Sequence, residues 1–480
     1  MIGLRRADVL RVVFLFVVQP LPATVLAGDD PLRTAPLRPP SASSPWESRT
    51  PAPPCVTDPA PADPLSLAAA IDLALCRHPK TRESWSAAKV AAAQLGVSRA
   101  ATLPTVTGTL GAQASETRNA LNAGRRDQAN GTLSFNYLLL DGGGRDAAIE
   151  QSRQALLAAD WSHNVAIQTV ILEAGQAFFQ LFAAEEAVTA ARAAESFASQ
   201  SLEAARARQK AGTATRADVL QSQTAHSQAI LTRTQSEGDA AVARGILATA
   251  LGLPAPTPLR LAPPRDLDPT APAETAVAGL VQTALEARPE LRAADANLAA
   301  ARAAVTVEQS AGKPTVSLFA NASAAAVSPG ADPRSGAVGV TVTIPVFLGY
   351  QTTYRVLSAR ENAERTSAVR ERLRNDISLE VWRAFQDMRS QAQALLTAND
   401  LVTSATESYE VALGRYRAGV GTVIDLLTAQ TALVQAGFQK IQARLRWNVS
   451  RVALARAIGA LEPALFSDTA PAGPTPRAPR

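Results

Sequence analysis

The glycine-rich stretch "LLLDGGGRDAA" (138–148) is the first place where residue types and their spacing could do chemistry. Gly142, Gly144 and Ala147 spell G-x-G-x-x-A, the pattern of a dinucleotide-binding turn that holds a pyrophosphate at a helix N-terminus. The run before these glycines alternates between apolar and polar residues, whereas a nucleotide-binding fold needs a buried, continuously apolar strand. We therefore interpret Gly142 and Gly143 as a hinge between strand and helix, and we predict no cofactor.

Other residues that could carry catalysis or bind a metal are sparse. The three histidines, His78, His163 and His226, are not at metal-ligand spacing, and we expect each to be a solvated helix residue. No Ser-His-Asp arrangement or nucleophilic cysteine setting is visible in the sequence. We predict no catalytic residue and no metal site, and therefore no enzyme.

The composition favours long helices over a large globular core. The chain has 480 residues and is rich in alanine, with only 5% aromatic residues and a net charge of +5. Alanine favours helix and lets helices approach closely. Lysine and arginine are scattered among acidic residues instead of gathered in one segment, so the sequence predicts no nucleic-acid partner.

The N-terminus predicts export from the cytoplasm. Residues 1–27 combine arginines, a short apolar run and small residues before Gly28, the pattern of a signal peptide, although a membrane anchor is the alternative. Residues 28–64 form a proline-rich extension without regular structure. Export would permit Cys55 and Cys76 to pair, and whether they do stays open. No other apolar stretch approaches the ~20 residues of a spanning helix, so strands would have to cross a membrane.

The chain contains an internal repeat of about two hundred residues. "AGTATRADVLQSQTA" (211–225) and "AGVGTVIDLLTAQTA" (418–432) share eight of fifteen positions at a shift of 207, and upstream prolines match at a shift of 210. We place the first repeat at 65–252, a proline-rich linker at 253–272, the second repeat at 273–461 and a disordered tail at 462–480.

Each repeat shows the same order of hydrophobic periods. Residues 65–101 and 275–312 are helical in composition. Strict alternation of apolar and polar residues follows and predicts two strands in each repeat. The chain would thus have four amphipathic strands, each of about ten residues. Then come two very long helical stretches, 142–211 and 349–418, each about 105 Å long if unbroken, and each followed by a returning helix of about thirty-five residues.

Four strands of this length predict a membrane β-barrel that several copies share. Tilted strands of ten residues match the hydrocarbon thickness, and strands persist in lipid only when the barrel is closed. Four strands cannot close a barrel; two copies would give eight strands and three copies twelve. A soluble four-stranded sheet beside a coiled coil is the alternative, because candidates for an aromatic girdle are few. These are Phe135, Tyr137, Phe319, Phe347 and Tyr350.

The repeated A-G-x-x-T-x-x-D-x-L-x-x-Q motif, the duplication and the strand exit "LLLDGG" resemble the TolC family of outer-membrane channel proteins over 65–461. The resemblance implies a mainly α fold with membrane β-structure, in which duplicated helical hairpins form a trimeric α-barrel tunnel that continues a shared twelve-stranded β-barrel. It also implies a homotrimer in the cell outer membrane with a large periplasmic portion. Its partners would be a periplasmic adaptor protein and an inner-membrane transporter, of the ABC or another class.

The same resemblance assigns roles to the repeated motif. The breaks at Gly212 and Gly419 would be turns at the periplasmic tip, where glycine permits a positive φ. Thr215 and Thr422 are expected to cap the returning helices. With Gly421, these residues would form a surface for adaptor docking, although they could also serve only as turns. Gly349 takes the place of the first hinge in the second repeat.

Acidic residues near the tips are candidates for the channel entrance. Asp425 matches a family position where carboxylates ring the entrance; three converging carboxylates would attract cations, and one or more of their pKa values would rise. The family often has a second acidic residue one turn later, where this chain has Thr428. Asp218 could pair with Arg415 or Arg417 and hold the tip shut, or be a solvated helix charge.

The sequence and this resemblance thus favour a passive export channel. Its expected cargo is a protein toxin of the cyclolysin or haemolysin type, exported by type I secretion. A channel for multidrug or metal efflux is the nearest alternative, because the same tube serves both. A periplasmic coiled-coil adaptor without a pore is the alternative from another class of protein. Such an adaptor usually has one helical hairpin, whereas the tip motif of this chain occurs twice. The cargo stays open between protein and small molecule.

Overall fold

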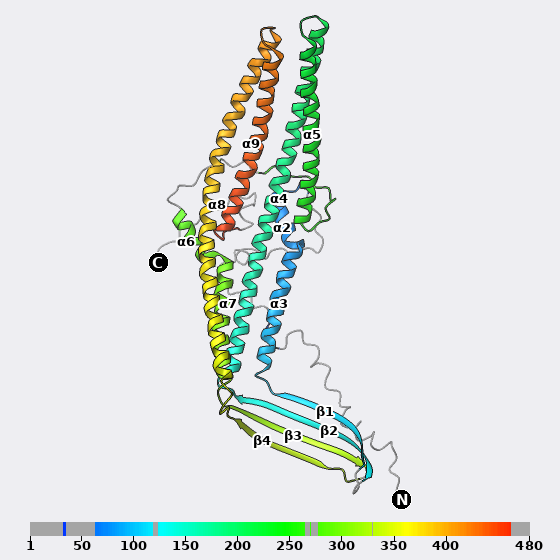
Figure 1. Ribbon diagram of the computed structural model, residues 1–480, viewed down its shortest axis with the longest axis vertical. Coiled ribbons are helices and arrows are strands. Elements are labelled where there is room, and N and C mark those ends of the chain that lie inside the picture. Colours follow the sequence, from blue (N-terminus) through cyan, green and yellow to red (C-terminus); the bar gives the residue numbers. More distant parts are fainter. Residues whose placement is uncertain are drawn as a thin grey trace, which may run out of the picture. The chain divides into compact units, whose positions relative to one another are not determined.

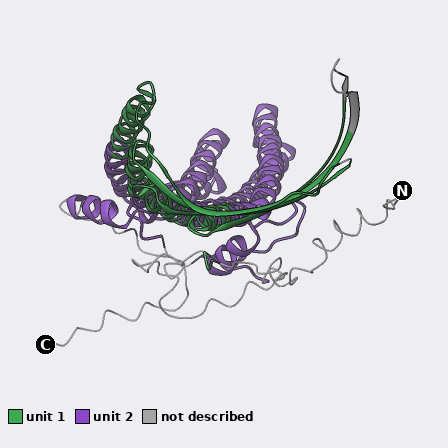
Figure 2. Ribbon diagram, turned by 90° about the horizontal axis from the view of Figure 1, so that it is seen from below, with its two compact units in different colours: residues 1–40, 87–160, 293–370 green, residues 41–86, 161–292, 371–480 purple. Residues whose placement is uncertain are grey.

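The computed structural model describes residues 32–34, 63–118, 123–264, 269, 277–328 and 330–461. The expected signal peptide, most of the proline-rich extension with Cys55, part of the linker and the tail from 462 lie outside these residues. The chain divides into two compact units (Figure 2). One takes in Ala87–Asp160 and Ala293–Arg370; the other takes in Trp161–Arg292 and the residues from Glu371 onward.

The first unit contains one antiparallel sheet of four strands in the order β1-β2-β3-β4 (Figure 1). The strands are β1 (Thr105–Arg118), β2 (Ala123–Leu140), β3 (Thr315–Ser328) and β4 (Arg334–Thr343). Strands β2 and β3 come from different repeats and pair from Asp127↔Ser328 to Leu140↔Val316, so the two predicted hairpins form a single sheet. Figure 2 shows this sheet bent into an arc.

Three strands are longer than the expected ten residues. Strands β1 and β3 have 14 residues, β2 has 18, and only β4 has 10. The additional residues of β2 include Gly131, Asn130 and Asp127, which have low strand propensity. They form strand because β2 is central and hydrogen-bonds to a neighbour on each side.

The sheet leaves large apolar side chains exposed to its surroundings. These are Val106, Leu110, Leu133, Val338, Val340 and Val342, each more than half exposed. A single exposed valine or leucine is common on protein surfaces, but a contiguous set on one sheet indicates contact with lipid or another protein surface.

Eight helices in the described residues form four pairs of equal length, one member in each repeat. These are α2 (Leu67–Arg77) and α6 (Val277–Ala287), with 11 residues each; α3 (Pro79–Ala100) and α7 (Pro289–Ser310), with 22; α4 (Gly144–Lys210) and α8 (Gln351–Arg417), with 67; and α5 (Arg216–Ala250) and α9 (Val423–Ala457), with 35. The long helices thus begin two residues later than expected, after positive-φ residues.

The expected helical stretches 65–101 and 275–312 are each two helices. They break at His78 and Arg288, immediately before Pro79 and Pro289. Proline disfavours helical backbone in the residue before it and is itself well suited to the first position of a helix. The same dipeptide position therefore ends one helix and starts the next in both repeats.

The main core of the second unit lies around α4. Ile71 and Ala74 of α2, Val170 and Phe178 of α4, and Leu247 of α5 belong to one cluster of buried apolar side chains. An 18-residue window of α4 has a mean hydropathy of 1.3, and half of it is buried. The sequence analysis expected no apolar stretch of this length after the N-terminus, so this window is a difference from that expectation. Its burial in the core around α4 accounts for its apolar composition.

A buried arginine holds α6, α7, α8 and α9 together. Arg288, only 3% exposed, donates from Nε and Nη2 to the carboxylate of Glu290 at 2.9 Å each and from Nη1 to Glu380 Oε2 at 2.8 Å. Its Nη1 also donates to the carbonyl of Ala457 at 3.1 Å. Arg456 donates to Glu380 Oε1 at 2.9 Å and completes the network.

Replacing Arg288→Ala is expected to destabilise the second unit by about 2 kcal/mol, because it removes a buried guanidinium whose charged hydrogen bonds run to the partly exposed carboxylates of Glu290 and Glu380. The loss should be measured as a shift of the urea unfolding transition followed by helical circular dichroism. Arg372→Ala is the matched control, since its ion pair with Asp376 is exposed. An equal, small shift for both variants would contradict the role of the network.

Candidate functional site at the hairpin tips

The two tip turns have the same backbone geometry. The first joins α4 to α5 and the second joins α8 to α9 (Figure 1). Gly212 and Gly419 both have φ +79°. The N–H of Gly212 donates to the carbonyl of Gln209, and the N–H of Thr213 donates to that of Arg208, each at 2.9 Å, which is a Schellman ending. A Cβ on Gly212 would meet nothing within 4 Å, so its positive φ, not lack of space, requires glycine there.

Each returning helix begins with a capping box. Thr215 Oγ1 accepts from the N–H of Asp218 at 3.2 Å, and the Asp218 carboxylate accepts from the N–H of Thr215 at 2.8 Å. Thr422 and Asp425 repeat this arrangement at 3.2 and 3.1 Å. The two aspartates were expected as entrance charges; their part in capping was missed, although T-x-x-D in the motif is a signature of it.

Gly421 lies within the second turn and packs tightly. A Cβ there would lie 3.0 Å from the Tyr416 nitrogen and 3.1 Å from the Arg415 carbonyl carbon. The N–H of Gly421 donates to the Arg415 carbonyl at 3.0 Å. Close approach of the backbone therefore favours glycine at this position.

An ion pair between Asp218 and Arg415 or Arg417, one of the two roles suggested for Asp218, is not formed within the described single chain. The hydrogen bonds of the Asp218 carboxylate run to Thr215, which holds it at the start of α5. The charge of Arg415 influences Asp425 instead. The hydrogen bonds from Thr422 lower the pKa of Asp425 from its ordinary value, and the positive charge of Arg415 lowers it further.

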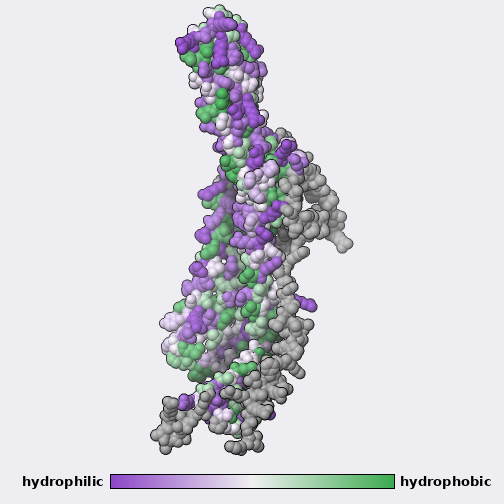
Figure 3. Space-filling view, turned by 90° about the vertical axis from the view of Figure 1, so that its right-hand side faces the viewer, coloured by the Kyte–Doolittle hydropathy of each residue, from purple (hydrophilic) through white to green (hydrophobic). Residues whose placement is uncertain are grey.

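A contact between the two hairpins went unpredicted. The guanidinium of Arg208, at the end of α4, lies over the ring of Tyr416, at the end of α8, with 4.2 Å from its carbon to the ring centroid. Tyr416 is 6% exposed and packs with Val423 and Leu426. The tips of the two hairpins therefore touch through one cation–π contact. The face of the tip region that Figure 3 shows, at its top, is a mixture of hydrophilic and hydrophobic residues in which hydrophilic ones predominate.

The strand–helix junctions have positive φ angles in both repeats. Gly142 and Gly143 have φ +66° and +88°, and Gly349 and Tyr350 have φ +59° and +62°. A left-handed conformation costs a residue other than glycine roughly 1–2 kcal/mol. Tyr350 occupies the position of Gly143 in the second repeat, since 350 − 143 = 207, and the aromatic residue there is not explained by the turn itself.

Protein side chains fill the space beside the G-x-G-x-x-A pattern. A Cβ on Gly142 would lie 2.6 Å from Lys313, and one on Gly144 would lie 2.4 Å from Ser310 Oγ. Lys313 Nζ donates to the carbonyl of Gly142 at 2.9 Å. These glycines permit close packing of the junction against the end of α7 and the turn that follows it, which explains their spacing without a ligand.

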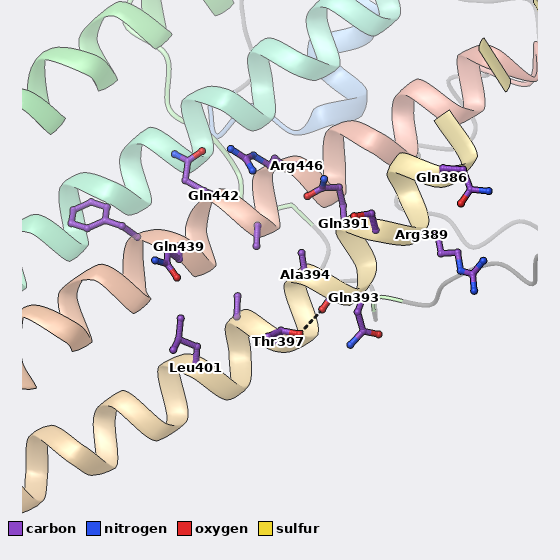
Figure 4. Close-up of a pocket in the computed structure, with 14 residues that line it drawn as sticks. Gln386, Arg389, Gln391, Gln393, Ala394, Thr397, Leu401, Gln439, Gln442 and Arg446 are labelled. Carbon is purple, nitrogen blue, oxygen red and sulfur yellow. Dashed lines mark hydrogen bonds between the residues drawn. The ribbon is translucent and has the colours of Figure 1, made fainter. Parts of the chain in front are cut away.

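A groove of about 1160 Å³ lies between α8 and α9 (Figure 4). Its lining is rich in carboxamides and contains two arginines and no acidic residue. The polar members are Gln386, Arg389, Ser390, Gln391, Gln393, Thr397, Gln439, Gln442 and Arg446. Carboxamides donate and accept hydrogen bonds without ionising, so this surface interacts weakly with many polar solutes and supplies no acid or base.

One histidine is not solvated, contrary to expectation. His163 is half-buried, its Nδ1 lies 2.8 Å from Ser84 Oγ, and its ring is 5.4 Å from that of Trp85. Burial lowers the pKa of His163. In the described residues, no group of three histidine, cysteine or acidic side chains could hold a metal ion.

Thr422→Ala is expected to remove about 1 kcal/mol from the start of α9 and to speed hydrogen exchange at the Asp425 amide about fivefold. The other hydrogen bond of the capping box runs from the Thr422 N–H to the Asp425 carboxylate. It is present at neutral pH, because the pKa of Asp425 is depressed, and it is lost as pH falls through that lowered pKa. Thr431→Ala, a mid-helix change on α9, is the matched control. Equal exchange in both variants would contradict the capping role.

Comparison with known proteins identifies the family. A family model described as outer membrane efflux protein matches residues 70–253 and 280–460. Protein CyaE of Bordetella pertussis is 32% identical over 408 residues, which cover 83% of this chain and 85% of the relative. The pyoverdine export outer membrane protein OpmQ of Pseudomonas aeruginosa is 27% identical over 342 residues, 69% of this chain and 70% of the relative.

The solved structures agree in fold. The structure of CusC has a TM-score of 0.74 at 19% identity and covers 82% of this chain and 92% of its own. This chain shares with these channel structures a mostly helical fold that includes a small antiparallel sheet. The chain belongs to the outer membrane efflux protein family and is an outer-membrane channel of an export system.

Proposed function

We propose that three copies of this chain assemble into one passive duct that carries an exported protein across the periplasm and the outer membrane. The observation that carries the assembly is the four-stranded sheet, whose outer strands β1 and β4 each pair on one side only within the described residues. Unpaired strand edges are not tolerated in lipid, and four strands are too few to close a barrel. Three copies would supply twelve strands.

The helices suit a conduit that does no chemistry. The groove between α8 and α9 presents five glutamine carboxamides beside two arginines, and carboxamides hydrogen-bond without binding any one solute tightly. The energy for export would then come from an inner-membrane transporter of the ABC or another class. The relatives are channels, which supports a non-enzymatic role.

A periplasmic adaptor protein would dock at the tips. The turns expose backbone at Gly212 and Gly419, Gly421 packs within the second turn, and the capping residues Thr215 and Thr422 fix where each returning helix begins. A partner hairpin could approach this bare backbone closely. The hinges at Gly142, Gly143 and Gly349 would let each strand turn into its helix.

Asp425 would form the entrance ring. Three copies bring three Asp425 carboxylates together, and their mutual repulsion would raise one or more pKa values, against the lowering that Thr422 causes in each chain. Together they would attract cations to the entrance.

The cargo that we favour is a protein toxin exported by type I secretion. The similarity to protein CyaE, which covers 83% of this chain, supports this choice. Efflux of small molecules is the second candidate, and the similarity to OpmQ, which is named for pyoverdine export, favours it.

A deletion strain would separate the two cargo classes. We expect loss of the chain to abolish release of a secreted protein into the medium while drug and metal susceptibility change little. Re-expression of the chain should restore secretion. Unchanged protein secretion with raised drug or metal susceptibility would overturn the proposed cargo in favour of efflux.

Removing the carboxylate at the entrance should change ion selectivity. We expect Asp425→Ala to reduce cation preference in planar bilayer recordings, seen as a reversal potential closer to zero under a salt gradient. Asp218→Ala is the matched control, because it removes an equivalent capping carboxylate from α5. If Asp425→Ala leaves the reversal potential unchanged, the ring is contradicted, whatever the result for Asp218→Ala.

A further inference from the structure

The two faces of the four-stranded sheet differ in polarity. Side chains alternate between the faces along a strand. On β2, one face carries Leu133, Phe135 and Tyr137, and we call it the apolar face. The other carries Ser134 and Asn136, and we call it the polar face. Directly opposite residues of paired strands share a face, so the register assigns the residues of the neighbouring strands to the same two faces.

The charged residues of the described strands all lie at one end of the sheet. These are Glu116, Arg118, Arg125, Arg126, Asp127 and Arg334. Strand β1 follows α3 and strand β2 leads into α4, so the charged end is the one away from these helices (Figure 1). In an outer-membrane channel whose helices lie in the periplasm, this is the outer end of the sheet.

Five of these six charged residues belong to the apolar face. They are Glu116, Arg118, Arg125, Asp127 and Arg334. Glu116 lies directly opposite Arg125, which alternates in step with Leu133. Arg334 alternates in step with Val338 on β4. Charge on a face that meets lipid is tolerated only near the boundary with water, so these residues mark the level at which the sheet leaves the hydrocarbon.

Arg126 is the one charged residue that the described strands place on the polar face. It alternates in step with Ser134 and lies opposite Ser115, whose Oγ donates to the Arg126 carbonyl at 3.3 Å. The Arg126 side chain is exposed and forms no ion pair within the part of the chain that the structure describes. The acidic residues of the strands, Glu116 and Asp127, belong to the other face. No carboxylate on its own face therefore neutralises Arg126.

The remaining polar side chains of this face are hydroxyls and carboxamides. They are Thr105, Thr107, Thr109, Gln113 and Ser115 on β1; Gln128, Asn130, Thr132, Ser134 and Asn136 on β2; Thr315, Ser317, Asn321 and Ser323 on β3; and Ser335, Thr341 and Thr343 on β4. In a closed membrane barrel the apolar face meets lipid and the polar face lines the water-filled interior. A neutral wall discriminates weakly between ions, so a single charged position on it sets the local preference.

We infer that Arg126 forms a cationic ring at the outer mouth of the channel and favours the passage of anionic groups there. The inference rests on the proposed assembly of three copies, which would bring three Arg126 side chains into one barrel. Arginine stays protonated at neutral pH, so the ring would carry a fixed positive charge. Its sign is opposite to that of the carboxylates proposed at the entrance, so the two ends of the channel would act on different ions.

Ion selectivity of the assembled channel in planar bilayers tests the ring. Under a potassium chloride gradient near about 0.1 M, we expect Arg126→Ser to lower the ratio of chloride to potassium permeability about twofold. Arg126→Lys should keep the ratio, because it keeps the charge. The matched control is Arg334→Ser, which removes the same charge from the same end of the sheet but from the apolar face, and we expect no change.

Salt concentration adds a second measurement. The difference between Arg126→Ser and the unmodified protein should vanish above about 1 M salt, because the Debye length falls from about 10 Å to about 3 Å. Arg126→Gln, which retains a long polar side chain, is measured in the same way, so that the result does not depend on assembly of the serine variant.

Two results would overturn the inference alone. One is an unchanged permeability ratio in conducting channels of Arg126→Ser or Arg126→Gln. The other is an equal change in Arg334→Ser, which would show that the face of the sheet is immaterial. Absence of any conducting channel in the unmodified protein would instead overturn the proposed function, and this inference with it.

Discussion

Backbone hydrogen bonding at the edges of the four-stranded sheet is the constraint on which the rest of the structure depends. Strands β2 and β3 satisfy both of their edges, while β1 and β4 satisfy one edge each within the described residues. In water an open edge can be solvated, but in hydrocarbon each unpaired N–H or C=O is costly. A chain of this family therefore cannot occupy its membrane alone, and its sheet is one part of a larger cylinder.

The duplication sets element lengths, while sequence divergence sets local chemistry. Paired helices keep equal lengths, yet equivalent positions carry different charges. Lys80 and Glu173 form one ion pair of 3.2 Å in the first repeat, and the equivalent Glu290 and Glu380 are two carboxylates in the second. Arg288, at the position of His78, resolves that conflict by binding both. The two carboxylates of the second repeat are thus matched by a third difference between the repeats, Arg288 in place of His78.

Periodicity allowed the helices to be predicted closely, since 35 residues were expected for α5 and α9 and 35 are found. The capping threonines and tip glycines were also predictable, because their effect is local. The far ends of β1 to β3 were not, because tertiary pairing there overrides weak propensity. The sequence also did not show which polar side chains would be buried by packing between helices. His163 and Asp160 have ordinary helical settings in the sequence, yet burial raises the pKa of Asp160 to about 6.

The aspartates that the sequence offers as entrance charges, Asp218 and Asp425, have local hydrogen-bond partners that the sequence reasoning did not assign to them. Asp218 was expected either to pair with Arg415 or Arg417 or to be a solvated charge, and Asp425 was expected to join an entrance ring. Within the chain, each carboxylate accepts a hydrogen bond from the threonine three residues before it. The contact that does join the tips, Arg208 over Tyr416, involves residues 208 apart in sequence and leaves no periodic signal. Because a capped carboxylate is already stabilised in its charged form, any entrance built from Asp425 starts with a charge that neighbouring copies must oppose. The electrostatics of such an entrance would therefore be decided by the distance between copies, a property of the assembly.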